Sequence, residues 1–251
     1  DTDALLFYRF ESEQGSNEII DDSTYAQTGI LTGNARRITP AGPVSCQALH
    51  IPLNTDARVA DAANTRLDIN DVGARGTISM WYRSNTDWNG GGARKLFDAS
   101  QRDDPSRNSV NVDKYFFMSL TNDGRIAFGL EDPNDGDLSM RTRPQNFVAG
   151  EWVHIALMWD APDENATLYL NGTQVPIDQN AQRNLRLDEL GPLDTLYIGD
   201  NRSLYLINNM TGNSANGQFD DVRVYGYQQT RTQVLADIDD VLECNGVHHY
   251  E

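Results

Sequence analysis

The chain has no long apolar run and no excess of positive charge. No segment approaches the roughly 18 consecutive apolar residues of a membrane-spanning helix, and no charged stretch followed by an apolar one opens the sequence. Lysine and arginine number 20 against 37 aspartates and glutamates, a formal net charge of −17. This balance argues against nucleic acid and anionic membranes as partners, and against membrane insertion of this chain; it suits cation binding in an extracellular setting.

Linkers are missing as well. No Pro-rich or Gly/Ser-rich stretch divides the 251 residues, so we expect one domain over residues 1–251. The chain begins at Asp1 without a methionine and ends on His248-His249-Tyr250-Glu251, which resembles the start of another strand. We interpret it as a piece of a longer exported protein.

Known catalytic motifs are absent. There is no Gly-x-Ser-x-Gly, no His-Glu-x-x-His and no phosphate-cradling glycine loop, and the acidic turn from Asp132 to Asp137 lacks the spacing and closing glutamate of an EF-hand. We therefore expect a protein that is not an enzyme. Carboxylates brought together from separate loops leave a hydrolase as a remaining alternative.

Cysteine is scarce, and the two cysteines stand far apart. A disulfide between Cys46 and Cys244 would tie an early strand to the C-terminal helix, with about 5 kcal/mol as the upper estimate for so long a loop. We expect this pairing because an exported location is already favoured. Two unpaired buried thiols are the alternative.

What the sequence does contain is a series of short apolar or alternating segments between turn clusters, typical of strands. They are Leu5 to Phe10, Ala48 to Leu53, Thr77 to Arg83, Tyr115 to Leu120, Ile126 to Leu130, Trp152 to Trp159, Thr167 to Leu170, Leu196 to Ile198 and Phe219 to Tyr225. Asn122-Asp123-Gly124 and Asn171-Gly172 predict hairpin turns. Helical spacing occurs only after Thr230 and Gln233, which form a capping box. The pattern predicts an all-β, two-sheet antiparallel jelly-roll sandwich with a short C-terminal helix.

Two adjacent carboxylates, Asp220 and Asp221, stand at the entry of a strand that otherwise belongs to the core. Strict alternation turns one of them inward with Val222 and Val224, where a charge is costly unless a cation or hydrogen-bond donors satisfy it. The sequence predicts either a metal site or a tightly hydrogen-bonded loop there.

Four segments in order resemble the laminin-G-like, or concanavalin A-like, jelly-roll domains. They are Thr77 to Tyr82, Gly150 to Leu157, Leu168 to Gly172, and Tyr197 to Gly199 leading to Phe219 to Tyr225. Cys46 to Pro52, Lys95 to Ser100 and the closing His248 to Glu251 are similar to the laminin-G-like domain of bacterial proteins linked to the mannose-sensitive haemagglutinin type IV pilus. The resemblance implies an exported module of a large surface or pilus-associated protein.

The resemblance also implies a structural Ca²⁺ where the first and last strands meet. The matching residues are Glu11 and Asp220 or Asp221, with Asp21 and Asp22 as loop donors. The alternative is a set of carboxylates held by loop amides.

Relatives of this kind use the rim loops of the sandwich to engage sugars or proteins. The expected ligand-binding residues are Trp88, Asp98, Asp200, Asn201 and Tyr205. Trp88 and Tyr205 are large aromatics in polar loops, where each either stacks on a sugar or anchors its loop. A solvated acidic turn is the alternative for the aspartates.

The glucanase branch of these relatives carries Glu-x-Asp-x-Glu on one strand, and this motif is absent here. The resemblance therefore favours a non-catalytic recognition or adhesion module that binds carbohydrate, with Ca²⁺, on the cell surface. Its expected partners are surface glycans or other surface or pilus proteins. The alternatives are a structural spacer without a ligand of its own and a glycoside hydrolase.

Overall fold

The structure is a computed structural model, and it describes most of the chain. The described residues are 3–11, 16–39, 46–53, 61–68, 71–100, 116–131, 137–163, 165–183, 195–200 and 214–240. No helix within these ranges is long and apolar enough to cross a bilayer.

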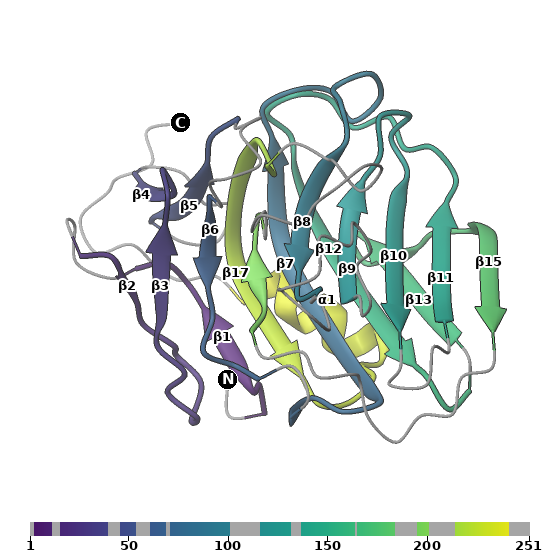
Figure 1. Ribbon diagram of the computed structural model, residues 1–251, viewed down its shortest axis with the longest axis horizontal. Helices are drawn as coiled ribbons and strands as arrows, with labels where there is room; N and C mark the ends of the chain where they lie inside the picture. The colour runs from purple at the N-terminus through teal and green to yellow at the C-terminus, as the bar shows by residue number, and fades with distance from the viewer. Residues whose placement is uncertain are drawn as a thin grey trace, which may run out of the picture.

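Two antiparallel sheets pack face to face as a sandwich (Figure 1). In the described residues the eight-stranded sheet has the order β14-β13-β12-β7-β17-β5-β4, with β1 also pairing with β17. Its strands are β1 (Leu6–Tyr8), β4 (Arg36–Ile38), β5 (Ala48–Ile51), β7 (Arg75–Ser84), β12 (Trp152–Asp160), β13 (Asn165–Leu170), β14 (Thr173–Gln174) and β17 (Gly217–Tyr225). The predicted jelly-roll sandwich is confirmed.

The nine-stranded sheet has the order β15-β11-β10-β9-β8-β16-β6-β3-β2 over the same residues. Its strands are β2 (Glu18–Ile19), β3 (Gly29–Thr32), β6 (Ala62–Asn64), β8 (Arg94–Asp98), β9 (Phe116–Leu120), β10 (Ile126–Glu131), β11 (Asp137–Thr142), β15 (Ile177–Arg183) and β16 (Tyr197–Ile198). Both predicted hairpins are present, since β9 pairs with β10 and β13 with β14. Asn171 and Gly172 both adopt positive φ, as a tight turn of this kind requires.

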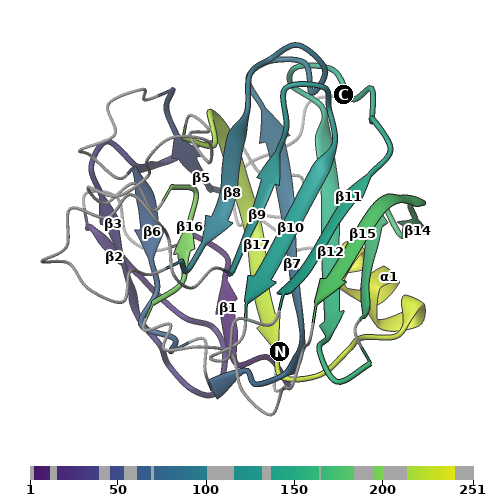
Figure 2. The same cartoon turned by 45° about the vertical axis from the view of Figure 1, so that its right-hand side comes forward.

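Strand β12 is covered on both faces, as its two apolar faces predict. Val153, Ile155, Leu157 and Trp159 belong to the core between the sheets. On the other face, Ala156 and Met158 pack against Val234 of the single described helix, α1 (Arg231–Asp239). Figure 2 shows α1 on the outside of the eight-stranded sheet. The capping box predicted at Thr230 and Gln233 begins this helix.

Strand β17 contains a bulge at the two adjacent aspartates. Phe219, Val222 and Val224 all lie in the core, so two residues stand between successive core residues where regular alternation allows one. Asp221 has φ of 45°, a left-handed conformation that aspartate tolerates better than most residues. The prediction that one aspartate turns inward with Val222 and Val224 was wrong, because the bulge keeps both out of that core row.

Candidate functional site

Asp221 lies in an ion-pair network that attaches α1 to β17. Arg223 Nη2 lies 3.1 Å from Asp221 Oδ2 and 2.6 Å from Asp240 Oδ2, and Nη1 lies 2.8 Å from Asp237 Oδ1. The guanidinium also stacks over the Phe7 ring, 4.2 Å from its centroid. The sequence predicts a metal cation or hydrogen-bond donors beside the two adjacent aspartates of β17. Arg223 supplies the positive charge at Asp221.

Asp237 is held by hydrogen bonds as well as by Arg223. Its Oδ1 accepts from the Tyr225 hydroxyl at 2.9 Å, and its Oδ2 accepts from Gln229 Nε2 at 2.9 Å and Ser79 Oγ at 3.2 Å. These donors come from β7, β17 and the segment before α1. The carboxylate is thus a fixed attachment point for the helix.

Two of the N-terminal carboxylates, Asp21 and Glu11, accept hydrogen bonds mainly from backbone amides. Asp21 Oδ1 accepts from the amides of Phe7 and Ser23, and its Oδ2 from the Ser23 hydroxyl and the Gln27 amide, all at 2.7–2.9 Å. Glu11 Oε1 accepts from the amides of Cys46 and Gln47 at 2.8 and 2.7 Å. Asp22 is solvent-exposed, and burial of part of its surface raises the pKa of its carboxyl.

These five carboxylates do not fit a calcium site. Calcium needs six to eight oxygens around one point. Backbone amides instead donate hydrogen bonds to Glu11 and Asp21, and the Arg223 guanidinium pairs with Asp221. In the described ranges no three His, Cys, Asp or Glu groups come together in a way that could hold a metal. Asp220 is buried, and its Oδ1 accepts from the amide of Asp221 at 2.9 Å. Calcium binding by this chain stays a prediction from the resemblance.

Burial raises the pKa of Asp221 to about 6, against the opposing attraction of Arg223. Below about pH 4 the carboxyl is protonated in both the folded and unfolded states, while above about pH 6 the folded state carries a buried charge. The free energy of unfolding should therefore fall by up to about 3 kcal/mol between these pH values. We expect Asp221→Asn to remove this decrease. Urea denaturation at pH 4, 5, 6 and 7 measures it, and an unchanged slope in the variant would contradict the assignment.

Trp88 has no exposed surface, so the prediction that it stacks on a ligand was wrong. Its ring contacts Phe147, with centroids 4.8 Å apart, and Tyr82, with centroids 6.4 Å apart. The buried side chain of Arg94 donates to the carbonyls of Asp87, Trp88 and Gly92 in the same loop. Trp88 anchors its loop, which is the alternative that the sequence left open.

The other predicted ligand-binding residues are buried or lie outside the described residues. Asp98 is fully buried, with Lys95 Nζ 2.6 Å from Oδ2 and the Ser100 amide 2.7 Å from Oδ1, and it is not available to a rim ligand. Asp200 is also fully buried. Asn201, Tyr205 and Cys244 lie outside the described residues. The predicted roles of Asn201 and Tyr205 stay predictions. Cys46 is disulfide-bonded, and its predicted pairing with Cys244 stays a prediction.

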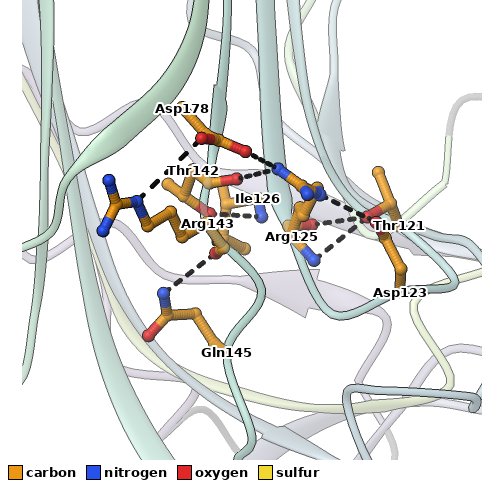
Figure 3. Close-up of polar contacts among 8 residues, drawn as sticks. All are labelled: Thr121, Asp123, Arg125, Ile126, Thr142, Arg143, Gln145 and Asp178. Carbon is orange, nitrogen blue, oxygen red and sulfur yellow. Dashed lines mark hydrogen bonds and ion pairs between the residues drawn. The ribbon is translucent and has the colours of Figure 1, made fainter.

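A different group of polar side chains gathers at the rim, at the end of the sandwich where β9 turns into β10 and β11 ends (Figure 3). We call it the rim cluster. Its members are Thr121, Asp123, Arg125, Arg143, Gln145 and Asp178.

Arg125 is the centre of the rim cluster. Its Nε lies 2.7 Å from Asp123 Oδ2 and its Nη1 2.5 Å from Asp178 Oδ2, and Nη1 also donates to the carbonyl of Thr142 at 3.0 Å. These hydrogen bonds raise the pKa of Arg125, and the Thr121 hydroxyl contributes most to lowering the pKa of Asp123. Asp123 is therefore ionised at neutral pH.

Arg143, Asp123 and Asp178 carry accessible charges, and the Asp123 side chain is 57% exposed. Of these, Arg143 and Asp178 lie next to each other. Their side chains are 67% and 39% exposed, and Arg143 Nε lies 3.9 Å from Asp178 Oδ1. At this distance both groups keep capacity for further hydrogen bonds. An exposed guanidinium beside a carboxylate offers both donors and acceptors, which is what recognition of a polyhydroxyl ligand requires.

Three loops fix the backbone around this cluster. The Trp88 amide donates to the carbonyl of Phe147, the Gly90 amide to that of Asn122, and the Gln145 amide to that of Gly124, at 2.7–3.0 Å. The buried Trp88 ring thus holds the loop that braces the turn before Arg125. Sequence reasoning found this turn but not the cluster, because Arg143 and Asp178 lie in segments without any motif.

A family model described as the concanavalin A-like lectin/glucanases superfamily, of the laminin G type, matches residues 55–235. The chain belongs to this superfamily. As a concanavalin A-like domain, it has the two packed sheets described above. No curated protein matches the chain in sequence.

Solved structures with the same arrangement include binding domains of botulinum neurotoxins. The binding domain of serotype G superposes with a TM-score of 0.61 at 14% identity, over 93% of this chain and 50% of that one. The binding domain of neurotoxin DC in complex with SialylT gives a TM-score of 0.61 at 12% identity, over 94% and 51%. The same domain has been solved with rat synaptotagmin II. This concanavalin A-like chain spans about half the length of these structures, and the likeness shows the shared fold.

Proposed function

We propose that the chain is a non-catalytic recognition module of an exported protein, and that its rim cluster binds neutral carbohydrate. The observation that carries this proposal is the exposed pair of Arg143 and Asp178 beside the anchored Arg125. Because the loops around it are braced by backbone hydrogen bonds, the backbone of the cluster would lose little conformational entropy on binding.

The comparisons support a binding role. The similar structures are described as binding or receptor-binding domains, one in complex with SialylT and one with rat synaptotagmin II. A surface glycan is the proposed partner here. A pilus-associated host protein and a calcium requirement are further parts of the proposal that rest on the resemblance alone.

The rim cluster is tested with a glycan array and a double variant, Arg143→Ala with Asp178→Ala. We expect the wild-type chain to bind neutral glycans and the variant to bind them about tenfold more weakly or worse, since it loses exposed donors and acceptors but no buried contact. Running the array with and without a chelator tests the calcium requirement in the same experiment.

Arg75→Ala is the matched control. Arg75 is 51% exposed and pairs with Asp160 at 2.8 Å, at the end of β7 away from the rim. This variant should bind neutral glycans like the wild type. An array without any neutral glycan bound, or equal binding by the double variant, would refute the proposal.

A further inference from the structure

Four Asn-x-Ser/Thr sequons occur in the chain, and two of them lie in the described residues. Asn165-Ala166-Thr167 begins β13, and Asn171-Gly172-Thr173 spans the turn between β13 and β14. The other two, at Asn201 and Asn209, lie outside the described residues. In an exported protein such a sequon accepts an N-linked glycan where it is accessible on the surface. The two sequons of β13 can therefore be compared as acceptors.

Asn165 is presented to solvent. Its side chain is exposed and forms no hydrogen bond within the described residues. Ala166 and Leu168 project into the core, so Asn165 and Thr167 project from the outer face of the eight-stranded sheet. The carboxamide and the hydroxyl of this sequon are therefore on the same face.

Residues 165–167 form an open edge of the eight-stranded sheet. They pair with residues 158–160 of β12 on one side, whereas β14 pairs only with Tyr169 and Leu170. Within the described ranges no strand pairs with their other side. A segment paired on one side opens locally at lower cost than a central strand. Its unpaired backbone groups are also a template for association with another chain. This edge is therefore accessible both to an enzyme and to a second chain.

Asn171, by contrast, is held in place by its neighbours. Its Oδ1 accepts from the amide of His154 at 2.8 Å, and its own amide donates to the carbonyl of His154 at 2.9 Å. Arg231 Nε donates to the carbonyl of Gly172 at 3.1 Å, and a Cβ atom on Gly172 would lie 2.5 Å from Leu235 Cδ2 of α1. This turn cannot bend around a transferase without breaking hydrogen bonds and moving away from α1.

Asp163 adds a charge that distinguishes Asn165 from the other acceptors. It is exposed and stands two residues before Asn165. The same position before the other three sequons holds Tyr169, Gly199 and Ile207, which carry no charge. A carboxylate here can pair with a cationic surface of a transferase and favour its approach. Exposure, an open strand edge and a neighbouring negative charge therefore coincide at Asn165.

We propose that Asn165 is N-glycosylated and that its glycan covers the open edge of β13. In this reaction Asn165 Nδ2 attacks the anomeric carbon of an oligosaccharide held on a polyprenyl pyrophosphate. An N–C bond forms as the C–O bond breaks, the lipid pyrophosphate leaves with the electron pair, and the amide gives one proton to the transferase. The modification rests on the proposed export of the chain but not on the rim cluster, because Asn165 stands opposite Asp160 at the other end of the sandwich.

The test incubates the folded chain with a lipid-linked oligosaccharide and two oligosaccharyltransferases in turn, one that requires an acidic residue two positions before the asparagine and one that does not. Fragment-ion mass spectrometry locates the glycan, and we expect it at Asn165 with both enzymes. With the second enzyme, occupancy of Asn165 should exceed that of Asn171 by about tenfold or more, because the turn at Asn171 must first break its hydrogen bonds. A peptide of residues 163–175, which carries both sequons without the fold, should remove this difference.

Asn165→Gln and Thr167→Val should each abolish this glycan, whereas Thr167→Ser should keep it. Thermal melts of the variants should match the wild type, because Asn165 is exposed and valine keeps the shape of threonine. Sedimentation should show that the glycosylated chain associates less than the unmodified chain. The rim double variant should be glycosylated like the wild type, so failure of the rim cluster leaves this result unchanged. The proposal is overturned if Asn165 of the folded chain stays unmodified with both enzymes, if Asn171 is modified equally well, or if both forms associate alike.

Discussion

Replacing Arg223 with methionine is expected to lower the free energy of unfolding by about 3–5 kcal/mol. Arg223 is 2% exposed and faces Asp221, Asp237 and Asp240 at 2.6–3.1 Å. Without the guanidinium, two buried carboxylates lose their positive partner at once. Urea denaturation at pH 7 measures the change.

The loss should be local as well as global. Asp237 and Asp240 belong to the end of α1, so the helix should separate from the sheet before the sandwich unfolds. Hydrogen exchange of the α1 amides would show this. Arg75→Met is the matched control, since an ion pair with one exposed partner contributes about 1 kcal/mol or less. A loss of under about 1 kcal/mol in Arg223→Met would contradict the role assigned to the network.

Trp88→Ala is expected to cost about 3–5 kcal/mol of stability, because it empties a fully buried site between Tyr82 and Phe147. The cavity lies directly under the loops that brace the rim cluster. Neutral glycan binding should therefore weaken even though Trp88 contacts no solvent.

Tyr25→Ala is the control for this substitution. Tyr25 is 58% exposed, so removal of its ring should change stability by about 0.5 kcal/mol or less. If Trp88→Ala unfolds at the same denaturant concentration as Tyr25→Ala, Trp88 is not the anchor of its loop.

Regular alternation and turn chemistry were enough to predict much of the sandwich. The capping box at Thr230 and the hairpin turns at Asn122 and Asn171 depend on neighbours in sequence, and both kinds of signal were correct. Short edge strands such as β2 and β4 were missed because two or three residues carry no periodic pattern.

The candidate sites were harder to predict because their partners come from distant segments. The sequence showed that Asp21, Glu11 and Asp221 needed partners, but not that backbone amides and Arg223 would supply them. Trp88 looked like a ligand-binding residue because its neighbours are polar, while the rings that cover it lie elsewhere in the chain. The pattern of apolar residues around Asp220 in the sequence does not reveal the bulge.

The bulge lies where β17 changes partners. Before it, β17 pairs with β5, and after it with β1, while β7 runs along the other side throughout. Three separate parts of the chain therefore meet on a strand that is synthesised after all of them. The centre of the eight-stranded sheet cannot assemble during synthesis until residue 225 has appeared, and its long-range contacts make its folding slow. Until then β1, β5 and β7 lack the strand that joins them.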